Sequence, residues 1–499
     1  MLHSLLQYLL LCFILLLFVH LFDKHLTGIS ILLLFWTVVE AVLGVLQACG
    51  YGGVSHHLYY VIIGSFGDPG TYAALIAVGM AVAAAVAWRQ YVKKNHYSSP
   101  FYCLSLATLA LGLIVLPASR SRAAWVGLIV AVLVLLLCEA DLTSWIRKHR
   151  LAAVGILASI LLASAGAFFM KQDSAIGRFH IWNMECRAIA EYPWEGVGIK
   201  NIFKAYGDAQ AAYFQETERP RSIIRVAGSP TYAYNEYLKF GMAWGIPGLI
   251  LSFAVALFVI LRLFKRHSPL AYGAIVYAVF AFASFPLSVA QLKVLGTVLL
   301  ASALVPEKAG HSWIFWLVGG LLFCASIVAC IILYPQEKAR RDAERVWKRS
   351  PYLKQNEYDL SVYKLQPLYP RLKDSYKYLF DYGYSLHKIG EFEKSNHILH
   401  QGADISCDPI FHTIIAKNHI ALGQYEEAET ELINAHWLIP CRIYPLLLMM
   451  RLYADTGRTE DAIDVGRTIE RMPVYERNPN MRRLQGEAMS LMSELQKER

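Results

Sequence analysis

The chain has 499 residues and a net charge of +9; 56% of its residues are hydrophobic, 17% are charged, and its mean hydropathy is +0.38. Soluble domains carry about 25% charged residues, so this composition excludes a protein that is soluble throughout. No dense stripe of Lys and Arg is present, which argues against nucleic-acid binding. The nine cysteines show no CxxC or Cys/His spacing, so we expect neither a zinc site nor a redox motif.

Apolar runs continue to about residue 334, and the sequence beyond them is charged and helix-like. We therefore expect a membrane domain over residues 1–334 and a soluble domain over residues 335–499. A helix that crosses ~30 Å of hydrocarbon needs ~20 apolar residues. The fold class expected is all-α, with a bundle of about ten membrane spans. These spans are residues 4–22, 27–48, 70–88, 101–117, 123–139, 151–169, 243–263, 271–289, 290–305 and 312–334.

Lys and Arg collect in the turns after the third, fifth and seventh spans, which alternation places on one side of the membrane. The residues are Arg89, Lys93, Lys94, Arg147, Lys148, Arg150, Arg262, Lys265 and Arg266. Because basic loops stay inside, this side is expected to be cytoplasmic. Residues 170–242 and the C-terminal domain then face a periplasm-like compartment.

Two polar turns lie on the expected outer side of the first five spans. Asp68-Pro69-Gly70 precedes the third span, and the stretch "PASRSRAAW" (117–125) joins the fourth span to the fifth. The second turn carries Arg120 and Arg122 on the expected outer side, which departs from the rule that basic residues stay inside. Either these side chains snorkel at a helix end, or they form a site for an anionic group.

Residues 170–242 are too long and too aromatic for a passive connection. An amphipathic helix is expected within residues 177–203, with a break at Tyr192-Pro193 and a turn at Gly196-Val197-Gly198. The stretch "YAYNEYLKFGMAWGIPG" (232–248) leads into the seventh span. Aromatic rings among scattered charges are typical of carbohydrate or headgroup surfaces, although membrane-interface belts use the same residues.

The C-terminal domain shows a period of 33 or 34 residues. A turn residue recurs at Asn356, Gly390, Gly423 and Gly457, and a small residue follows each of them at Ser361, Ser395, Ala428 and Ala462. The pattern resembles the tetratricopeptide repeat, in which paired helices stack into an α-solenoid. The domain is either a rigid cap or a concave surface for a protein or glycan partner. Cys407 and Cys441 occupy equivalent positions, which usually lie beyond the ~7 Å limit for a disulfide.

Four of these features, in this order, resemble the O-antigen ligase-related family of bacterial membrane glycosyltransferases. The family includes O-antigen ligases, repeat-unit polymerases and O-linked protein oligosaccharyltransferases. The likeness covers roughly residues 60–265. It rests on Asp68-Pro69-Gly70, Ser121-Arg122-Ala123-Ala124-Trp125, Gly177-Arg178 with Trp182, and Tyr234-Asn235 followed by Gly245 and Gly248.

The resemblance implies transfer of a glycan from undecaprenyl diphosphate to an acceptor hydroxyl at the periplasmic face of a bacterial inner membrane. It implies no cofactor and no metal. Arg122 and Arg178 would hold the diphosphate, because guanidinium groups grip phosphate in a fork and stabilise charge on the leaving group. Arg120 would assist them or only snorkel. The acceptor is a lipid core, another glycan or a protein.

The family motif has a histidine where this chain has Tyr234. A phenol with an ordinary pKa near 10 is a poor base at neutral pH. Either Tyr234 only positions the acceptor, or another group is the base, or catalysis depends on stabilisation of the leaving group. The other candidate bases are Glu236, His180 and the pair His56-His57.

Ligase-type transfer is the first choice because the motifs fit the ligase pattern, followed by polymerisation and then transfer to protein. A non-catalytic, membrane-anchored repeat scaffold is an alternative of another class, which the missing histidine favours. The outward arginines and the aromatic loop argue against it. A lipid-linked glycan flippase is disfavoured because the spans are nearly free of charge.

Overall fold

The computed structural model describes most of the chain as helices in two compact units. The described residues are 26–51, 62–92, 99–139, 172–217, 219–305, 312–473 and 479–497, with isolated positions 11, 14 and 148. The apolar unit is Met1–Phe169, Tyr232–Tyr237 and Leu249–Pro335. The polar unit is Met170–Thr231, Leu238–Gly248 and Gln336–Arg499. Within the described residues every regular element is a helix, which confirms the all-α fold class.

Five described helices are long and apolar enough to cross a membrane. They are α2 (Thr27–Ala48), α3 (Pro69–Val92), α4 (Pro100–Ser119), α5 (Arg122–Glu139) and α11 (Glu236–Lys265). They correspond to the second, third, fourth, fifth and seventh expected spans. The spans expected at residues 4–22 and 151–169 lie outside the described residues, as do Lys93, Lys94, Arg147, Arg150 and the pair His56-His57.

The continuous span expected over residues 271–289 is wrong in its extent. Helix α12 (Leu270–Ala283) ends early, and a 3-10 turn, η1 (Pro286–Ser288), separates it from α13 (Ala290–Leu304). Proline lacks an N–H and disfavours the helical conformation in the residue before it. Phe285 accordingly has φ −125° and ψ 54°. Helix α14 (Ser312–Arg349) covers the last expected span and continues beyond its end.

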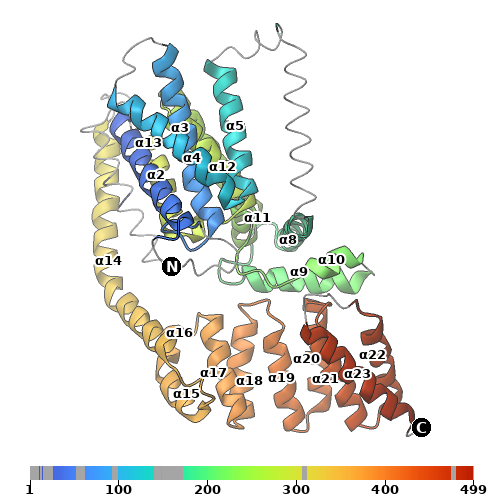
Figure 1. Ribbon diagram of the computed structural model, residues 1–499. Coiled ribbons are helices and arrows are strands. Elements are labelled where there is room, and N and C mark those ends of the chain that lie inside the picture. Colours follow the sequence, from blue (N-terminus) through green and yellow to red (C-terminus); the bar gives the residue numbers. More distant parts are fainter. Residues whose placement is uncertain are drawn as a thin grey trace. The chain divides into compact units, whose positions relative to one another are not determined.

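Small residues allow the helices of the apolar unit to approach closely around α3 (Figure 1). A Cβ placed on Gly112 of α4 would meet the side chain of Met80 at 2.5 Å, and one on Gly273 of α12 would meet Val82 at 2.9 Å. Tyr72, Leu75 and Ile76 of α3 are fully buried. The packing therefore fixes how α4 and α12 lie against α3.

Ion pairs and helix caps tie one end of the apolar unit together. Arg89 at the end of α3 bonds Glu139 at the end of α5 (Nε–Oε2, 2.9 Å) and donates to the carbonyl oxygen of His267 (2.6 Å). Tyr272 donates to the same carboxylate at 2.7 Å. Arg266 caps α13 by donating to the carbonyl oxygen of Ser302 at 3.0 Å. The ends of α3, α5 and α13 therefore meet the α11–α12 turn.

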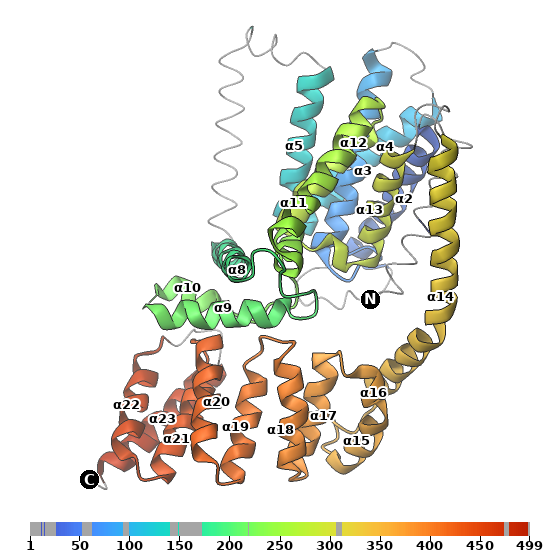
Figure 2. The ribbon, with the colours of Figure 1, turned by 180° about the vertical axis from the view of Figure 1, so that it is seen from behind.

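The C-terminal part of the polar unit is a row of helices that lie side by side in both views (Figures 1 and 2). It comprises α15 (Tyr358–Leu365), η2 (Gln366–Leu368), α16 (Tyr369–Leu372), α17 (Tyr376–Lys388), α18 (Phe392–Ala403), α19 (Ile410–Ala421), α20 (Tyr425–Leu438), α21 (Ile443–Asp455), α22 (Thr459–Arg471) and α23 (Pro479–Lys497). We call this row the helical array.

The periodic residues of the array occupy equivalent structural positions. The turn residues Asn356, Gly390, Gly423 and Gly457 all have positive φ angles, between 60° and 85°. The small residues Ser361, Ser395, Ala428 and Ala462 are all fully buried. Cys407 is buried, and both it and Cys441 are free thiols. The sequence period therefore coincides with a repeated left-handed turn residue and a repeated buried small residue.

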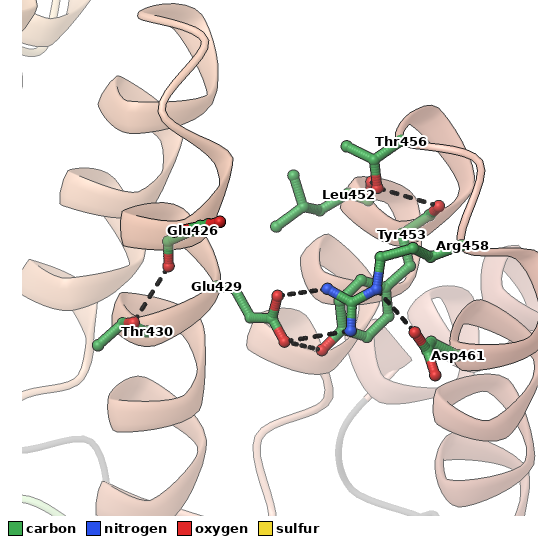
Figure 3. A network of polar contacts seen from close by, with 8 residues as sticks. All are labelled: Glu426, Glu429, Thr430, Leu452, Tyr453, Thr456, Arg458 and Asp461. Carbon is green, nitrogen blue, oxygen red and sulfur yellow. Dashed lines mark hydrogen bonds and ion pairs between the residues drawn. The ribbon is translucent and has the colours of Figure 1, made fainter.

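A polar network joins α20, α21 and α22 (Figure 3). The hydroxyl of Tyr453 donates to Glu429 Oε1 at 2.6 Å, and Arg458 Nη1 lies 2.6 Å from Glu429 Oε2. Arg458 also bonds Asp461 (Nε–Oδ2, 2.7 Å), and its guanidinium carbon lies 4.2 Å from the centre of the Tyr453 ring. One carboxylate thus links three successive helices.

Candidate functional site

The stretch "PASRSRAAW" forms a tight connection between α4 and α5. Arg120 adopts the left-handed conformation (φ 52°), and its N–H donates to the carbonyl oxygen of Pro117 at 3.1 Å. Arg122 is the first residue of α5 and is half-buried, whereas Arg120 is exposed. The N–H of Trp125 donates to the carbonyl oxygen of Ser121, continuing the first turn of α5. Arg122 therefore adds its charge to the positive end of the helix dipole.

Asp68-Pro69-Gly70 forms the start of α3 beside this connection. Asp68 caps the helix, since its Oδ2 accepts the N–H of Thr71 at 2.8 Å. Pro69 occupies the first helical position, where its missing N–H costs nothing. A Cβ placed on Gly70 would lie 3.9 Å from Ser121 Oγ. Two motifs that are far apart in sequence therefore meet at the starts of α3 and α5.

Two polar side chains of α2 hold the segment that leads into Asp68, and the sequence analysis missed both. Glu40 is 4% exposed and accepts the N–H of Ser65 at 2.9 Å and its hydroxyl at 2.5 Å. Gln47 Oε1 accepts the N–H groups of Ile63 and Gly64 at 3.0 and 2.9 Å. A carboxylate within an apolar span is the signal that points to such a role.

The segment that contains Tyr234 folds against the break between α12 and α13. Tyr232 stacks on Phe285 with 4.1 Å between ring centres, and Tyr234 meets the same ring edge-on at 5.5 Å. Glu236 is 2% exposed, and its Oε1 accepts the N–H of Leu287 at 2.7 Å. Asn235, 1% exposed, accepts the N–H of Tyr237 at 3.0 Å.

These residues belong to the same end of the apolar unit as Arg122. Helices α3 and α5 are parallel, because Gly70 lies beside Ser121 at their starts and Arg89 bonds Glu139 at their ends. Tyr272, near the start of α12, also bonds Glu139, so α12 runs in the opposite direction. The end of α12 and the break after it therefore lie where α3 and α5 begin.

Arg178 lies in the polar unit, on α8 (Gln172–Glu191), which packs against α9 (Ile202–Glu216) and α10 (Arg221–Val226). It is half-buried, as is Trp182, which meets Phe179 edge-on at 5.5 Å. A Cβ placed on Gly177 would lie 3.6 Å from the Cβ of Val226. The expected break after this helix is confirmed, since α8 ends at Glu191.

His180 is 5% exposed and lies in the interior of the polar unit. Its Nε2 lies 2.9 Å from Gln210 Oε1, and its ring is 5.6 Å from those of Tyr213 and Phe214. Burial lowers the pKa of His180, although the hydrogen bond with Gln210 opposes this shift. The imidazole is therefore neutral at pH 7 and in contact with the core.

The glycines of the loop motif permit close backbone contacts within the polar unit. The N–H groups of Val197 and Gly198 donate to the carbonyl oxygens of Met242 and Ala243 at 2.8 and 3.0 Å. Gly245 has φ 67° and ψ −164°, where a Cβ would collide with the carbonyl oxygen of Pro193. A Cβ on Gly248 would lie 2.6 Å from the carbonyl oxygen of Phe240. Trp244 and Gly245 thus form a kink that divides α11.

Each compact unit contributes one motif arginine. Arg122 and the start of α5 supply positive charge in the apolar unit, and Arg178 supplies it in the polar unit. Among the described residues no group of three or more His, Cys, Asp or Glu side chains is placed to hold a metal ion.

Residues 107–253 match a family described as O-antigen ligase. The matched segment contains Arg120, Arg122, Arg178, Tyr234 and Gly245. No curated protein matches the chain. The match supports a relationship to the O-antigen ligase-related family and, in general terms, glycan transfer of the ligase or polymerase type. Together with the apolar helices, it indicates a membrane protein.

Proposed function

We propose that the protein transfers a glycan from an undecaprenyl diphosphate carrier to the hydroxyl of a lipid-core acceptor. The observation that carries this proposal is the family match, which spans both Ser121-Arg122 and Gly177-Arg178. The meeting of the α3 and α5 starts at Gly70 and Ser121 supports it. The reaction would take place on the periplasmic side of a bacterial inner membrane and contribute to lipopolysaccharide assembly.

In this reaction the acceptor oxygen forms a bond to the anomeric carbon of the sugar as the bond to the carrier diphosphate breaks. The acceptor hydroxyl loses its proton, and negative charge develops on the departing diphosphate. Arg122 and Arg178 stabilise that charge through fork-shaped hydrogen bonds. The start of α5 adds its dipole to Arg122, and Arg120 supports the pair from the α4–α5 turn. No nucleotide is needed, because the diphosphate is already a good leaving group.

The remaining motif residues would shape the site around these arginines. Tyr234, in the histidine position of the motif, orients the acceptor hydroxyl, while Glu236 holds the backbone of the α12–α13 break. His180 has a structural role, since it is buried against Gln210. Asp68, Pro69, Gly70, Trp125 and Asn235 would set the local structure in the apolar unit, and Gly177, Trp182, Gly245 and Gly248 would do so in the polar unit.

We expect Arg122→Ala and Arg178→Ala each to lower glycan transfer by about 10²-fold or more, because each removes a charge that stabilises the leaving group. Transfer is measured by complementing a strain that lacks the protein, with membrane insertion checked by fractionation. Arg221→Ala is the matched control, since Arg221 is an exposed arginine on α10 of the same loop. Full transfer in both variants would overturn the assignment of Arg122 and Arg178 to diphosphate binding.

The glycan profile of the same deletion strain identifies the acceptor. Lipid core without attached glycan supports ligation, glycan limited to one repeat unit supports polymerisation, and loss of glycoprotein supports transfer to protein. Tyr234 in place of histidine favours one candidate of another class, a non-catalytic membrane-anchored scaffold. An unchanged glycan structure, combined with loss of a protein complex, would support that scaffold and contradict transfer.

A further inference from the structure

Gln210 is fully buried at the point where α8, α9 and the helical array meet. Its Oε1 accepts the hydroxyl of Tyr206 at 2.8 Å and lies 2.9 Å from His180 Nε2. Because a carbonyl oxygen only accepts, His180 must donate through Nε2. The Nε2 of Gln210 donates to the carbonyl oxygens of Gly228 and Leu438 at 3.2 and 2.5 Å. We call residues 172–228, which contain α8, α9 and α10, the α8–α10 segment. One amide therefore joins parts of this segment to each other and links the segment to the end of α20.

Close packing surrounds this amide. A Cβ placed on Gly207 of α9 would lie 2.8 Å from the Cβ of Cys407, and 3.1 Å from Leu438 Cδ2. Met184, Tyr206, Tyr213, Phe214, Ala227 and Cys407 form one buried cluster. Burial raises the pKa of the Cys407 thiol to about 12, as expected for an inert side chain in a core. The core of the α8–α10 segment thus includes a residue of the array.

We propose that the helical array is the platform that positions the α8–α10 segment, and with it Arg178, for the carrier diphosphate. Gln210 is the positioning residue in this arrangement and does not touch substrate. It bonds His180, which lies two residues after Arg178 on α8. The activity part of this inference rests on the proposed function, whereas the platform itself is testable without it.

Two polar links between described residues of the segment and the array differ in kind. Replacing Gln210 by an apolar residue leaves the buried carbonyl oxygen of Leu438 and the partly buried one of Gly228 without this donor, which carries a desolvation penalty. Lys200 and Asp374 also connect them, with 2.9 Å between Nζ and Oδ1, but both side chains are more than 60% exposed. Exposed pairs contribute little. Lys200→Ala is therefore the matched control for Gln210→Leu.

The platform is tested by amide hydrogen exchange on the full-length protein in detergent. Gln210→Leu should speed exchange in α8, α9 and α10 by about tenfold or more through local opening, and leave α3, α5 and α22 unchanged. Tyr206→Phe removes a single hydroxyl bond and should change exchange by only about twofold in the same helices. Lys200→Ala should match the wild type. Unchanged exchange in α8–α10 of Gln210→Leu would overturn the platform.

The positioning role is tested by kinetics with an undecaprenyl-diphosphate-linked glycan and a lipid-core acceptor. Gln210→Leu should raise KM for the donor by about fivefold or more while KM for the acceptor stays within about twofold. A fall in kcat with both KM values unchanged indicates fewer folded molecules and would overturn the positioning role. Faster exchange in Gln210→Leu together with a fully active Arg178→Ala variant would contradict the proposed function and leave the platform standing.

Discussion

At the scale of single residues, an added side chain destabilises the fold in two ways, through an unfavourable backbone conformation and through a steric collision. Gly245 and Gly198 distinguish these two effects. Both have positive φ angles, 67° and 73°. A Cβ on Gly245 would also collide with the carbonyl oxygen of Pro193, whereas nothing lies within 4 Å of one on Gly198. The kink at Gly245 therefore depends on backbone conformation and on space, and the turn at Gly198 depends on conformation alone.

We expect Gly245→Ala to destabilise the protein by about 3 kcal/mol and Gly198→Ala by about 1 kcal/mol. The smaller value is the usual cost of a left-handed conformation in a non-glycine residue, and the larger one adds strain from the collision. Thermal unfolding of the two full-length variants in the same detergent measures the difference. Equal losses would show that the backbone at Gly245 relaxes away from Pro193.

At the scale of helices, a single carboxylate makes the packing of α20, α21 and α22 depend on pH. Burial raises the pKa of Glu429. Hydrogen bonds from Tyr453 and Arg458, together with the charge of Arg458, lower the pKa by more than burial raises it, so the net shift is downward. A carboxylate whose pKa is lower in the folded state stabilises the fold above its ordinary pKa. That contribution is lost as the pH falls through the folded value.

We therefore expect α20, α21 and α22 to lose protection from hydrogen exchange, corrected for intrinsic rates, as the pH falls below about 4. Glu429→Gln should weaken this pH dependence and lower the free energy of protection at pH 7. The loss should be only about 1 kcal/mol, because Arg458 is 46% exposed and solvent screens the ion pair. Asp464→Asn on α22 is the control, since both Asp464 and its partner Arg467 are more than half exposed. The same acid response in wild type and Glu429→Gln would contradict this role.

At the scale of the whole molecule, the two arginines of the proposed site belong to different compact units, Arg122 to the apolar unit and Arg178 to the polar unit. Hydropathy and turn residues predicted most of the helices in these two units, because burial in lipid and left-handed turns depend on local composition. The break at Pro286 was missed, because a long apolar run outweighed one proline.

The supporting contacts of the candidate site could not be predicted from the sequence. Arg122, Arg178 and the motif glycines stood out because their residue types match a family pattern. The roles of Glu40 and Gln210 depend on partners distant in sequence, such as Ser65 and Leu438. Hydrophobic periodicity carries no information about such pairs. His180 was a candidate base by its position beside Arg178, and only tertiary structure places it in a core.

The most direct test of glycan transfer uses the purified full-length protein in liposomes with an undecaprenyl-diphosphate-linked glycan and isolated lipid core. We predict that the lipid core gains glycan and that one carrier diphosphate is released for each transfer. The Arg122→Ala, Arg178→Ala double variant should leave the donor intact, while Arg221→Ala should react like the wild type. Equal consumption of the donor by the wild type and the double variant, or none by the wild type, would contradict the proposed function.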